Sequence, residues 1–163
     1  MSNTSAPRNW VTTIMFSVTF AVALIAVPRY GIVHGYHWGL WLGFFALLWA
    51  NGLSITGGYH RLWAHSAYKA HPVLKVFYAL FGAGALQNSI LIWASGHRRH
   101  HRHVDHVEKD PYSAQRGLWF SHIGWMLRDY PSAEPNFDNS PDLQRDPIVM
   151  WQHRHYLALT LIM

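Results

Sequence analysis

Two clusters of histidine are the residues in this sequence best suited to bind a metal ion. The first is the pair His60 and His65, and the second is the run His97, His100 and His101. An α-helix turns by about 100° per residue, so the offsets of three and four place the second cluster within about a 100° sector of one helix face. Positions five apart differ by about 140°, so the first pair needs a bent or ending helix to converge. Together the clusters predict a metal site built from these five histidines.

Each cluster also has a purely structural interpretation. The first pair could be interfacial histidines beside a basic residue, and the second could be the solvated basic end of a helix. His103 and His106 continue the second run toward other faces and are interpreted as surface residues or supports for the ligands. His122 lies in an aromatic amphipathic stretch, where packing or hydrogen bonding is expected. The other histidines lie near predicted membrane interfaces, where amphipathic rings are common: His34, His37, His71, His153 and His155.

The absence of cysteine limits the kinds of metal site that are possible. With no cysteine in 163 residues, disulfides, thiolate zinc sites and cysteine-ligated iron–sulfur clusters are excluded. Imidazole suits iron, copper and zinc alike. Five histidines exceed what a tetrahedral zinc ion needs, which indicates two metals or further ligands elsewhere.

The composition is that of a membrane protein. Half of the residues are hydrophobic, 13% are charged, and there are 9 Trp, a profile unlike that of a soluble domain. The formal charge of +5 would suit a nucleic-acid-binding protein or a membrane protein with basic cytoplasmic segments. The long apolar runs favour the second, so no nucleic-acid partner is expected.

Two apolar runs, residues 10–27 and 38–56, predict a transmembrane hairpin. A secretory signal peptide is the rival interpretation of the first run, but only Arg8 precedes it and no small-residue cleavage site follows. The runs are separated by residues expected to break the helix: Pro28, Arg29, Gly31 and Gly35.

The distribution of positive charge predicts the orientation of the hairpin. All Lys and Arg residues except Arg8 and Arg29 lie at or beyond Arg61. The positive-inside rule assigns that side, with the N-terminus and the histidine clusters, to the cytoplasm.

The rest of the chain predicts a membrane-associated segment and a polar cap. Residues 72–95 are apolar, but small and polar residues at 82–89 predict a break. A simple span here would put the two histidine clusters on opposite sides of the membrane, so we expect a re-entrant or interfacial segment. Residues 96–155 predict a cytoplasmic region of short helices and loops. A further apolar run begins at 156–163 and is too short for a span, so the chain is expected to be C-terminally incomplete. The predicted fold is all-α, a single domain over residues 1–163.

The motifs resemble those of a known enzyme family. Residues 58–65 (GYHRLWAH), Trp93 with residues 97–101 (HRRHH), and residues 117–125 (GLWFSHIGW) are similar in order and spacing to the membrane fatty acyl-CoA delta-9 desaturases. The resemblance runs from about the second half of the first span to the end of the chain.

The resemblance implies a fold, a reaction and a set of site residues. It implies a helical membrane protein with a cytoplasmic cap and a centre of two iron ions held by three histidine boxes, which inserts a cis double bond into a saturated acyl chain using dioxygen. The first box corresponds to His60 and His65, and the second to His97, His100 and His101. The third box and the second pair of spans have no counterpart here. Asn88 and Trp93 match positions near the acyl thioester and acyl chain, so they are candidate substrate contacts.

The resemblance also implies partners, and it leaves alternatives open. No flavin or nicotinamide fingerprint occurs, so electrons are expected from a ferredoxin-type or cytochrome-type donor. Residues 94–96 (Ala-Ser-Gly) stand where animal relatives carry an Arg-Asp pair that touches coenzyme A. An acyl-CoA, an acyl-carrier-protein thioester and a phospholipid acyl chain are therefore all possible substrates. The rival functions are a histidine-box hydroxylase, a membrane metal-binding or transport protein, and a truncated fragment that binds metal without catalysis.

Overall fold

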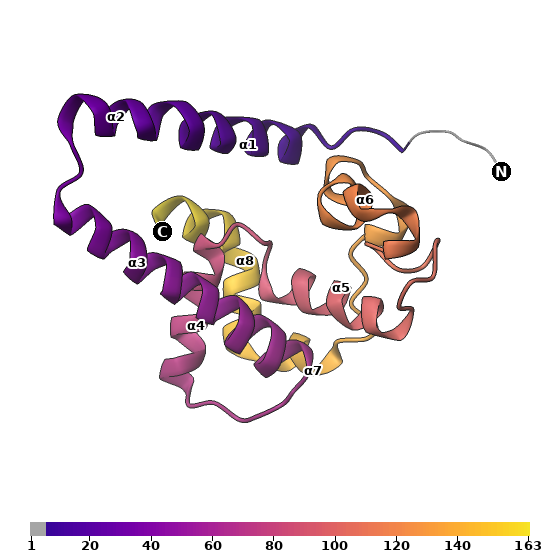
Figure 1. Cartoon of the computed structure of the whole chain (residues 1–163). Helices are drawn as coiled ribbons and strands as arrows, with labels where there is room; N and C mark the ends of the chain where they lie inside the picture. Colours follow the sequence, from indigo (N-terminus) through magenta and orange to yellow (C-terminus); the bar gives the residue numbers. More distant parts are fainter. Residues whose placement is uncertain (1–5) are drawn as a thin grey trace. The chain divides into compact units, whose positions relative to one another are not determined.

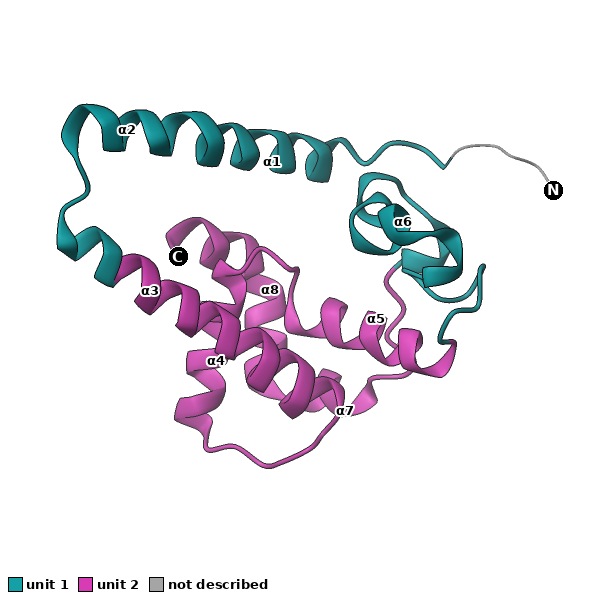
Figure 2. Cartoon of the chain, viewed as in Figure 1, with its two compact units in different colours: residues 1–42, 104–134 teal, residues 43–103, 135–163 magenta. Residues whose placement is uncertain are grey.

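The computed structural model describes residues 6–163, and the regular elements in that range are helices (Figure 1). The described residues contain no β-strand, only an isolated bridge between Arg8 and Arg128. The prediction of an all-α fold is confirmed. The chain forms two compact units, residues 1–42 with 104–134 and residues 43–103 with 135–163 (Figure 2).

The first unit begins with one long apolar helix. It comprises α1 (Trp10–Ala21), a π-helical turn η1 (Val22–Ala26) and α2 (Val27–His34). The 25 residues are long and apolar enough to cross a membrane, and none of them is buried. Apolar side chains exposed along a whole helix suit contact with lipid.

The prediction that this helix ends at residue 27 is wrong. Pro28 lies within this continuous helix, as the second residue of α2, where proline has no N–H to donate to the preceding turn. The preceding turn is π-helical, with the Val27 N–H bonded to the Val22 carbonyl. A π-turn of this kind is one of the ways a helix accommodates a proline. The helix ends at Gly35, whose φ of 71° is in the left-handed region.

The rest of the first unit is a compact set of short helices. These are η3 (Ala114–Arg116), α6 (Leu118–His122), η4 (Gly124–Leu127) and η5 (Pro131–Ala133). Backbone bonds join this set to the start of α1, from the Asn9 N–H to the Leu127 carbonyl (3.0 Å) and from the Asp129 N–H to the Pro7 carbonyl (2.9 Å).

The second unit contains most of α3 (Trp38–Leu53) and the π-helix η2 (Ser54–Ala64) that continues it. The combined helix, Trp38–Ala64, has 27 residues and is also long and apolar enough to cross a membrane. The apolar run predicted at 38–56 lies within this helix, which continues through Gly57 and Gly58 by changing from α to π winding.

Two helices follow in place of a single third span. α4 (Pro72–Gly84) and α5 (Ile90–Arg102) are separated by a turn at 85–89, so the predicted break is present. Leu86 and Asn88 adopt φ values of 59° and 71° there, a conformation that cannot continue a right-handed helix. The association of this segment with a membrane stays a prediction.

The unit is completed by α7 (Pro141–Arg145) and α8 (Pro147–Ile162). The helix that carries the apolar run at 156–163 starts earlier, at Pro147, because the Asp146 carboxylate accepts from the N–H groups of Ile148 and Val149 and caps it. The start of a further span at 156–163 stays a prediction. α4 and α5 each pack against both η2 and α8. Buried side chains from these elements form the core, among them Tyr59, Leu62, Trp63, Ala79, Ile90 and Val149.

Candidate metal centre

The π winding of η2 is what brings the first histidine pair together. The backbone N–H of His65 donates to the carbonyl of His60, 3.0 Å away, which is the i to i+5 bond of a π-turn. Residues five apart therefore lie one turn apart, and the two imidazole ring centroids are 4.5 Å from each other. The predicted bent or ending helix is in fact a π-helix that ends at His65.

The second pair lies on a regular α-helix. His97 and His101 are four residues apart on α5, so they share one face. The Nε2 atoms of these two residues are 3.0 Å apart, and the Nε2 atom of His65 lies 3.1 Å from that of His97. With His60 they form a group of four whose ligand atoms all lie within 4.8 Å of one another.

These contacts fit a shared metal ion better than hydrogen bonds alone. The Nε2 atom of an imidazole carries either one proton or one lone pair, yet that of His97 faces two other Nε2 atoms at 3.0 and 3.1 Å. It can make only one good hydrogen bond in this arrangement. Nitrogen ligands at about 2.0–2.1 Å from one metal lie roughly 3 Å apart when adjacent, which matches both separations. The four histidines could therefore hold a metal ion.

Two imidazoles of the site, those of His65 and His97, favour the neutral, metal-binding form. Burial, followed by the neighbouring His101, His60, His65 and His100, lowers the pKa of His97 to about 3. Burial also lowers the pKa of His65, with smaller contributions from His60, His101 and Arg98. Only a deprotonated imidazole nitrogen can bind a metal.

Close packing against glycine fixes the position of η2. A Cβ atom on Gly58 would lie 2.7 Å from the Tyr78 side chain, and one on Gly82 would lie 2.3 Å from the Tyr59 ring. Both contacts join η2 to α4. No larger residue at either position would allow the helices to approach as closely.

The fifth predicted ligand lies beside the group. His100 is not one of the four converging histidines, and its ring centroid is 6.1 Å from that of His97 and 5.4 Å from that of His101. Its role as a ligand stays a prediction.

The candidate substrate contacts have different surroundings. Trp93 is half-buried and stacks on His97, with ring centroids 4.8 Å apart and an interplanar angle of 20°. Asn88 is exposed in the turn before α5, where its backbone N–H donates to the Tyr156 hydroxyl. Trp93 therefore lies in contact with the metal-binding group, whereas Asn88 lies in the turn just before the start of the same helix.

Two polar residues beside the site were not predicted from the sequence. Arg98 contacts the end of η2, and Gln152 on α8 contacts both η2 and α5. The only feature of the sequence that could have indicated Gln152 is a glutamine among apolar residues near the start of the last helix. His153, predicted as an interfacial residue, has its Nδ1 atom 2.7 Å from the Ser89 hydroxyl at the start of α5, and its place at an interface stays a prediction.

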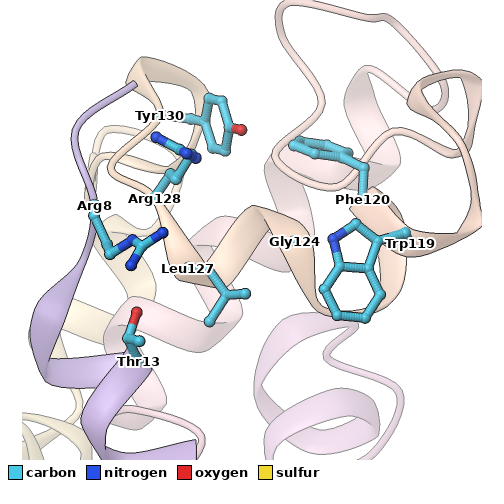
Figure 3. A pocket seen from close by; sticks show the side chains of 8 residues that line it. All are labelled: Arg8, Thr13, Trp119, Phe120, Gly124, Leu127, Arg128 and Tyr130. Atoms are coloured by element: carbon cyan, nitrogen blue, oxygen red, sulfur yellow. The ribbon is translucent and has the colours of Figure 1, made fainter. Parts of the chain in front are cut away.

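The first unit holds a separate cavity of about 350 Å³. It lies between the start of α1 and the α6–η4 segment, and none of the predicted site residues lines it (Figure 3). Positive charge and aromatic rings are combined in its wall. The lining residues are Arg8, Thr13, Trp119, Phe120, Gly124, Leu127, Arg128 and Tyr130.

Comparison with known proteins places this histidine group in a family. No family model matches the chain. Acyl-CoA desaturase 1 of Saccharomyces cerevisiae is 47% identical over 113 residues, which cover 69% of this chain and 22% of the yeast protein. The sn-2 palmitoyl-lipid 9-desaturase of a Nostoc species is 38% identical over 164 aligned residues, 96% of this chain and 54% of the relative. The chain belongs to the fatty acyl desaturase family. The predicted resemblance is confirmed.

The relatives of this desaturase-family chain are longer and differ in their named substrates. The chain spans between about a fifth and about a half of the length of the relatives that match it. One relative is named for acyl-CoA and another for a palmitoyl lipid. An Acyl-CoA Delta12-desaturase of Acheta domesticus is 49% identical over 110 residues, 66% of this chain and 30% of that protein. Family membership therefore leaves the acyl carrier and the bond position open.

Proposed function

We propose that this chain supplies the first two histidine boxes of an oxygen-dependent fatty acyl desaturase, which inserts a cis double bond at the delta-9 position of a saturated acyl thioester. The observation that carries the proposal is the convergence of four imidazoles from η2 and α5 within 4.8 Å. In a chain similar to acyl-CoA desaturases, such a group suits iron.

The proposed reaction balances as a four-electron reduction of dioxygen. Two electrons and two protons come from adjacent methylenes of the acyl chain, two electrons come from an external donor, two protons come from solvent, and two waters form. Bound iron would supply the dioxygen activation. The four histidines would hold it, and a second iron would require further ligands, with His100 as the nearest candidate in this chain.

The chain's own residues would orient the substrate beside this centre. Trp93 stacks on His97 and offers an apolar wall against which methylenes could pack. Asn88, exposed at the start of the same helix, could contact the thioester end. A fixed position of the acyl chain relative to the metal selects the bond that is oxidised. Acyl-CoA is the proposed substrate because the Saccharomyces cerevisiae and Acheta domesticus relatives, 47% and 49% identical to this chain, carry that name.

The proposed setting is a membrane with the metal centre on its cytoplasmic face. Two helices are long and apolar enough to span it, and the Lys and Arg residues from Arg61 onward favour the cytoplasmic side for the histidines. A ferredoxin-type or cytochrome-type donor could dock there, since a basic surface attracts an acidic partner.

The test is expression in a host that lacks its own desaturase, followed by analysis of the acyl chains. The product of the complete gene is compared with the 163-residue chain, each supplied with iron, dioxygen and an electron donor. We expect a cis double bond at carbon 9 from the complete product and none from the 163-residue chain. Hydroxylated acyl chains would instead support a hydroxylase. Metal uptake without oxygen-dependent lipid turnover in either sample would support a non-catalytic metal-binding protein.

A further inference from the structure

Arg98 joins the two histidine-bearing helices at one end of the site. It lies next to His97 on α5, but its guanidinium points to the end of η2, where Nε donates to the Ala64 carbonyl (3.0 Å) and Nη2 to the Trp63 carbonyl (2.7 Å). The last carbonyls of a helix have no partner within it, and a cation there is favourable. Ala64 directly precedes His65, so this side chain ties the backbone beside one histidine to the backbone beside another.

The remaining donors of Arg98 are also used. Nη1 donates to the Asn139 carbonyl at 3.0 Å and to Asp142 at 2.7 Å, and Nη2 donates to the second oxygen of Asp142 at 2.8 Å. With the two bonds to η2, all five N–H groups of the guanidinium have acceptors. Lysine could not reproduce this arrangement, because an ammonium has three donors and no planar fork.

Gln152 joins the same two helices at the other end. Its side chain is fully buried. The amide nitrogen donates to the Tyr59 hydroxyl (2.7 Å), and the amide oxygen accepts from the Ile90 N–H (3.0 Å). Tyr59 directly precedes His60, and Ile90 is the first residue of α5. A buried amide with both groups paired holds its neighbours in a specific arrangement, because breaking either bond leaves a buried polar group unsatisfied.

We propose that Arg98 and Gln152 are positioning residues, which hold η2 and α5 at the separation that a shared metal ion requires. The proposal rests on the metal centre proposed above and extends it to residues outside the histidine set. Neither side chain is a ligand. Ligand atoms must be placed to within about 0.2 Å for normal metal–ligand distances, and the loss of residues that orient ligands typically lowers metal affinity by about 10–100-fold.

The experiment measures binding of cobalt(II) alone to the full chain in detergent, by titration and by visible absorption of the bound ion. The variants are Arg98→Lys and Gln152→Met, with Arg102→Lys, exposed on the same helix, and Gln115→Met as matched controls. We expect both variants to bind cobalt about 10–100-fold more weakly, with altered absorption bands, and both controls to match the wild type. Gln152→Glu, which keeps an acceptor for the Ile90 N–H and one for the Tyr59 hydroxyl, is expected to restore most of the affinity.

The absorption bands separate positioning from a general effect on folding. If a residue only stabilises the fold, its substitution would lower the unfolding temperature but leave the bands and affinity of the folded protein unchanged, and that result would overturn the proposal. If Gln152→Met does not fold, Tyr59→Phe removes the hydroxyl that accepts from Gln152 and keeps the ring, and reduced affinity is again expected. Failure of the wild-type chain to bind cobalt would refute the metal centre itself. Variants that bind cobalt as tightly as the wild type would refute only the positioning roles of Arg98 and Gln152.

Discussion

The two helices that carry the histidines each bring a pair of imidazoles together, but by different backbone geometries. On α5 the spacing of four between His97 and His101 matches the α-helical repeat, and the helix is regular. On η2 the spacing of five between His60 and His65 would separate the imidazoles on an α-helix, and the backbone is wound as a π-helix over Ser54–Ala64. The comparison shows that ligand spacing and local winding are matched in each helix.

The two helices also differ in what stabilises them. The π-helix is a rare conformation, and here it is supported by packing from outside, with Tyr78 against Gly58 and Arg98 on its final carbonyls. α5 begins with a Ser89 cap and needs no unusual support. We therefore expect substitutions around η2 to affect the fold and the metal site together, and substitutions on α5 to affect mainly the metal site.

The largest expected effect is that of His97→Ala. The Nε2 atom of His97 is the one that faces those of both His65 and His101, so its loss removes the ligand that lies between the other two. We expect cobalt or iron affinity to fall by more than about 100-fold, beyond the range for residues that only orient ligands. Equilibrium metal titration measures this. His106→Ala, from the same histidine-rich run, should bind as the wild type does, and equal losses in both variants would argue against a specific site.

The next prediction tests the match between spacing and winding on η2. The double variant Ala64→His with His65→Ala changes the spacing from five to four, the value found on α5. Since Ala64 is buried in the core and η2 is π-helical, the moved imidazole should not reach the other histidines. We expect affinity as low as that of His65→Ala alone, measured by the same titration. Recovery of binding by the moved histidine would show that η2 can rewind as an α-helix.

The difference in winding between the two helices also explains how much of this site could be predicted from the sequence. For α5 the spacing alone places His97 and His101 on one face, and the structure agrees. For η2 no sequence rule for α-helices predicts the convergence, because it requires π winding, and Gly57 and Gly58 of that helix lie against Tyr78, a residue of a later helix. Residue patterns also predicted the break before α5.

Helix ends were the least predictable feature. The sequence placed ends at Pro28 and after residue 56, and helix continues through both. Proline and glycine are unfavourable in an ordinary α-helix. Here a preceding π-turn accommodates Pro28, and Gly57 and Gly58 allow Tyr78 of α4 to pack closely against η2. The buried link from Gln152 to Tyr59 joins residues 93 positions apart, so it depends on tertiary structure that local patterns do not contain.

A smaller effect is expected from Gly58→Ala. The new Cβ atom would lie 2.7 Å from Tyr78 Cβ and Cγ, so η2 and α4 would have to move apart. Overpacking of this kind typically costs about 1–3 kcal/mol of stability. Gly52→Ala is the matched control, because nothing lies within 4 Å of a Cβ there, and an alanine in that helix should be neutral or stabilising by up to about 1 kcal/mol. Denaturant unfolding in detergent compares them, and equal stabilities would show that the close approach of η2 and α4 is not required.

The smallest effect concerns the ion pair that supports Arg98. The hydrogen bond from Arg98 is the largest cause of a lowered pKa at Asp142, whose usual value is 3.8. A lowered pKa means that the folded state favours the carboxylate, so this stabilisation is fully present above pH 3.8 and is lost as the pH falls through the lowered value. The Asp142 side chain is 51% exposed, so solvent screening limits the pair to about 0.2–1 kcal/mol. Asp142→Asn should therefore be less stable than the wild type by that amount near neutral pH.

The pH dependence distinguishes this ion pair from simple loss of packing. The stability difference between Asp142→Asn and the wild type should stay constant from pH 7 to about pH 5 and shrink below the usual carboxyl pKa of 3.8. Glu108→Gln, at an exposed carboxyl, should show no difference at any of these pH values. A difference for Asp142→Asn that did not change with pH would mean that the amide disturbs packing at the start of α7. In that case the orientation of Arg98 toward η2 would depend on its bonds to the Trp63 and Ala64 carbonyls.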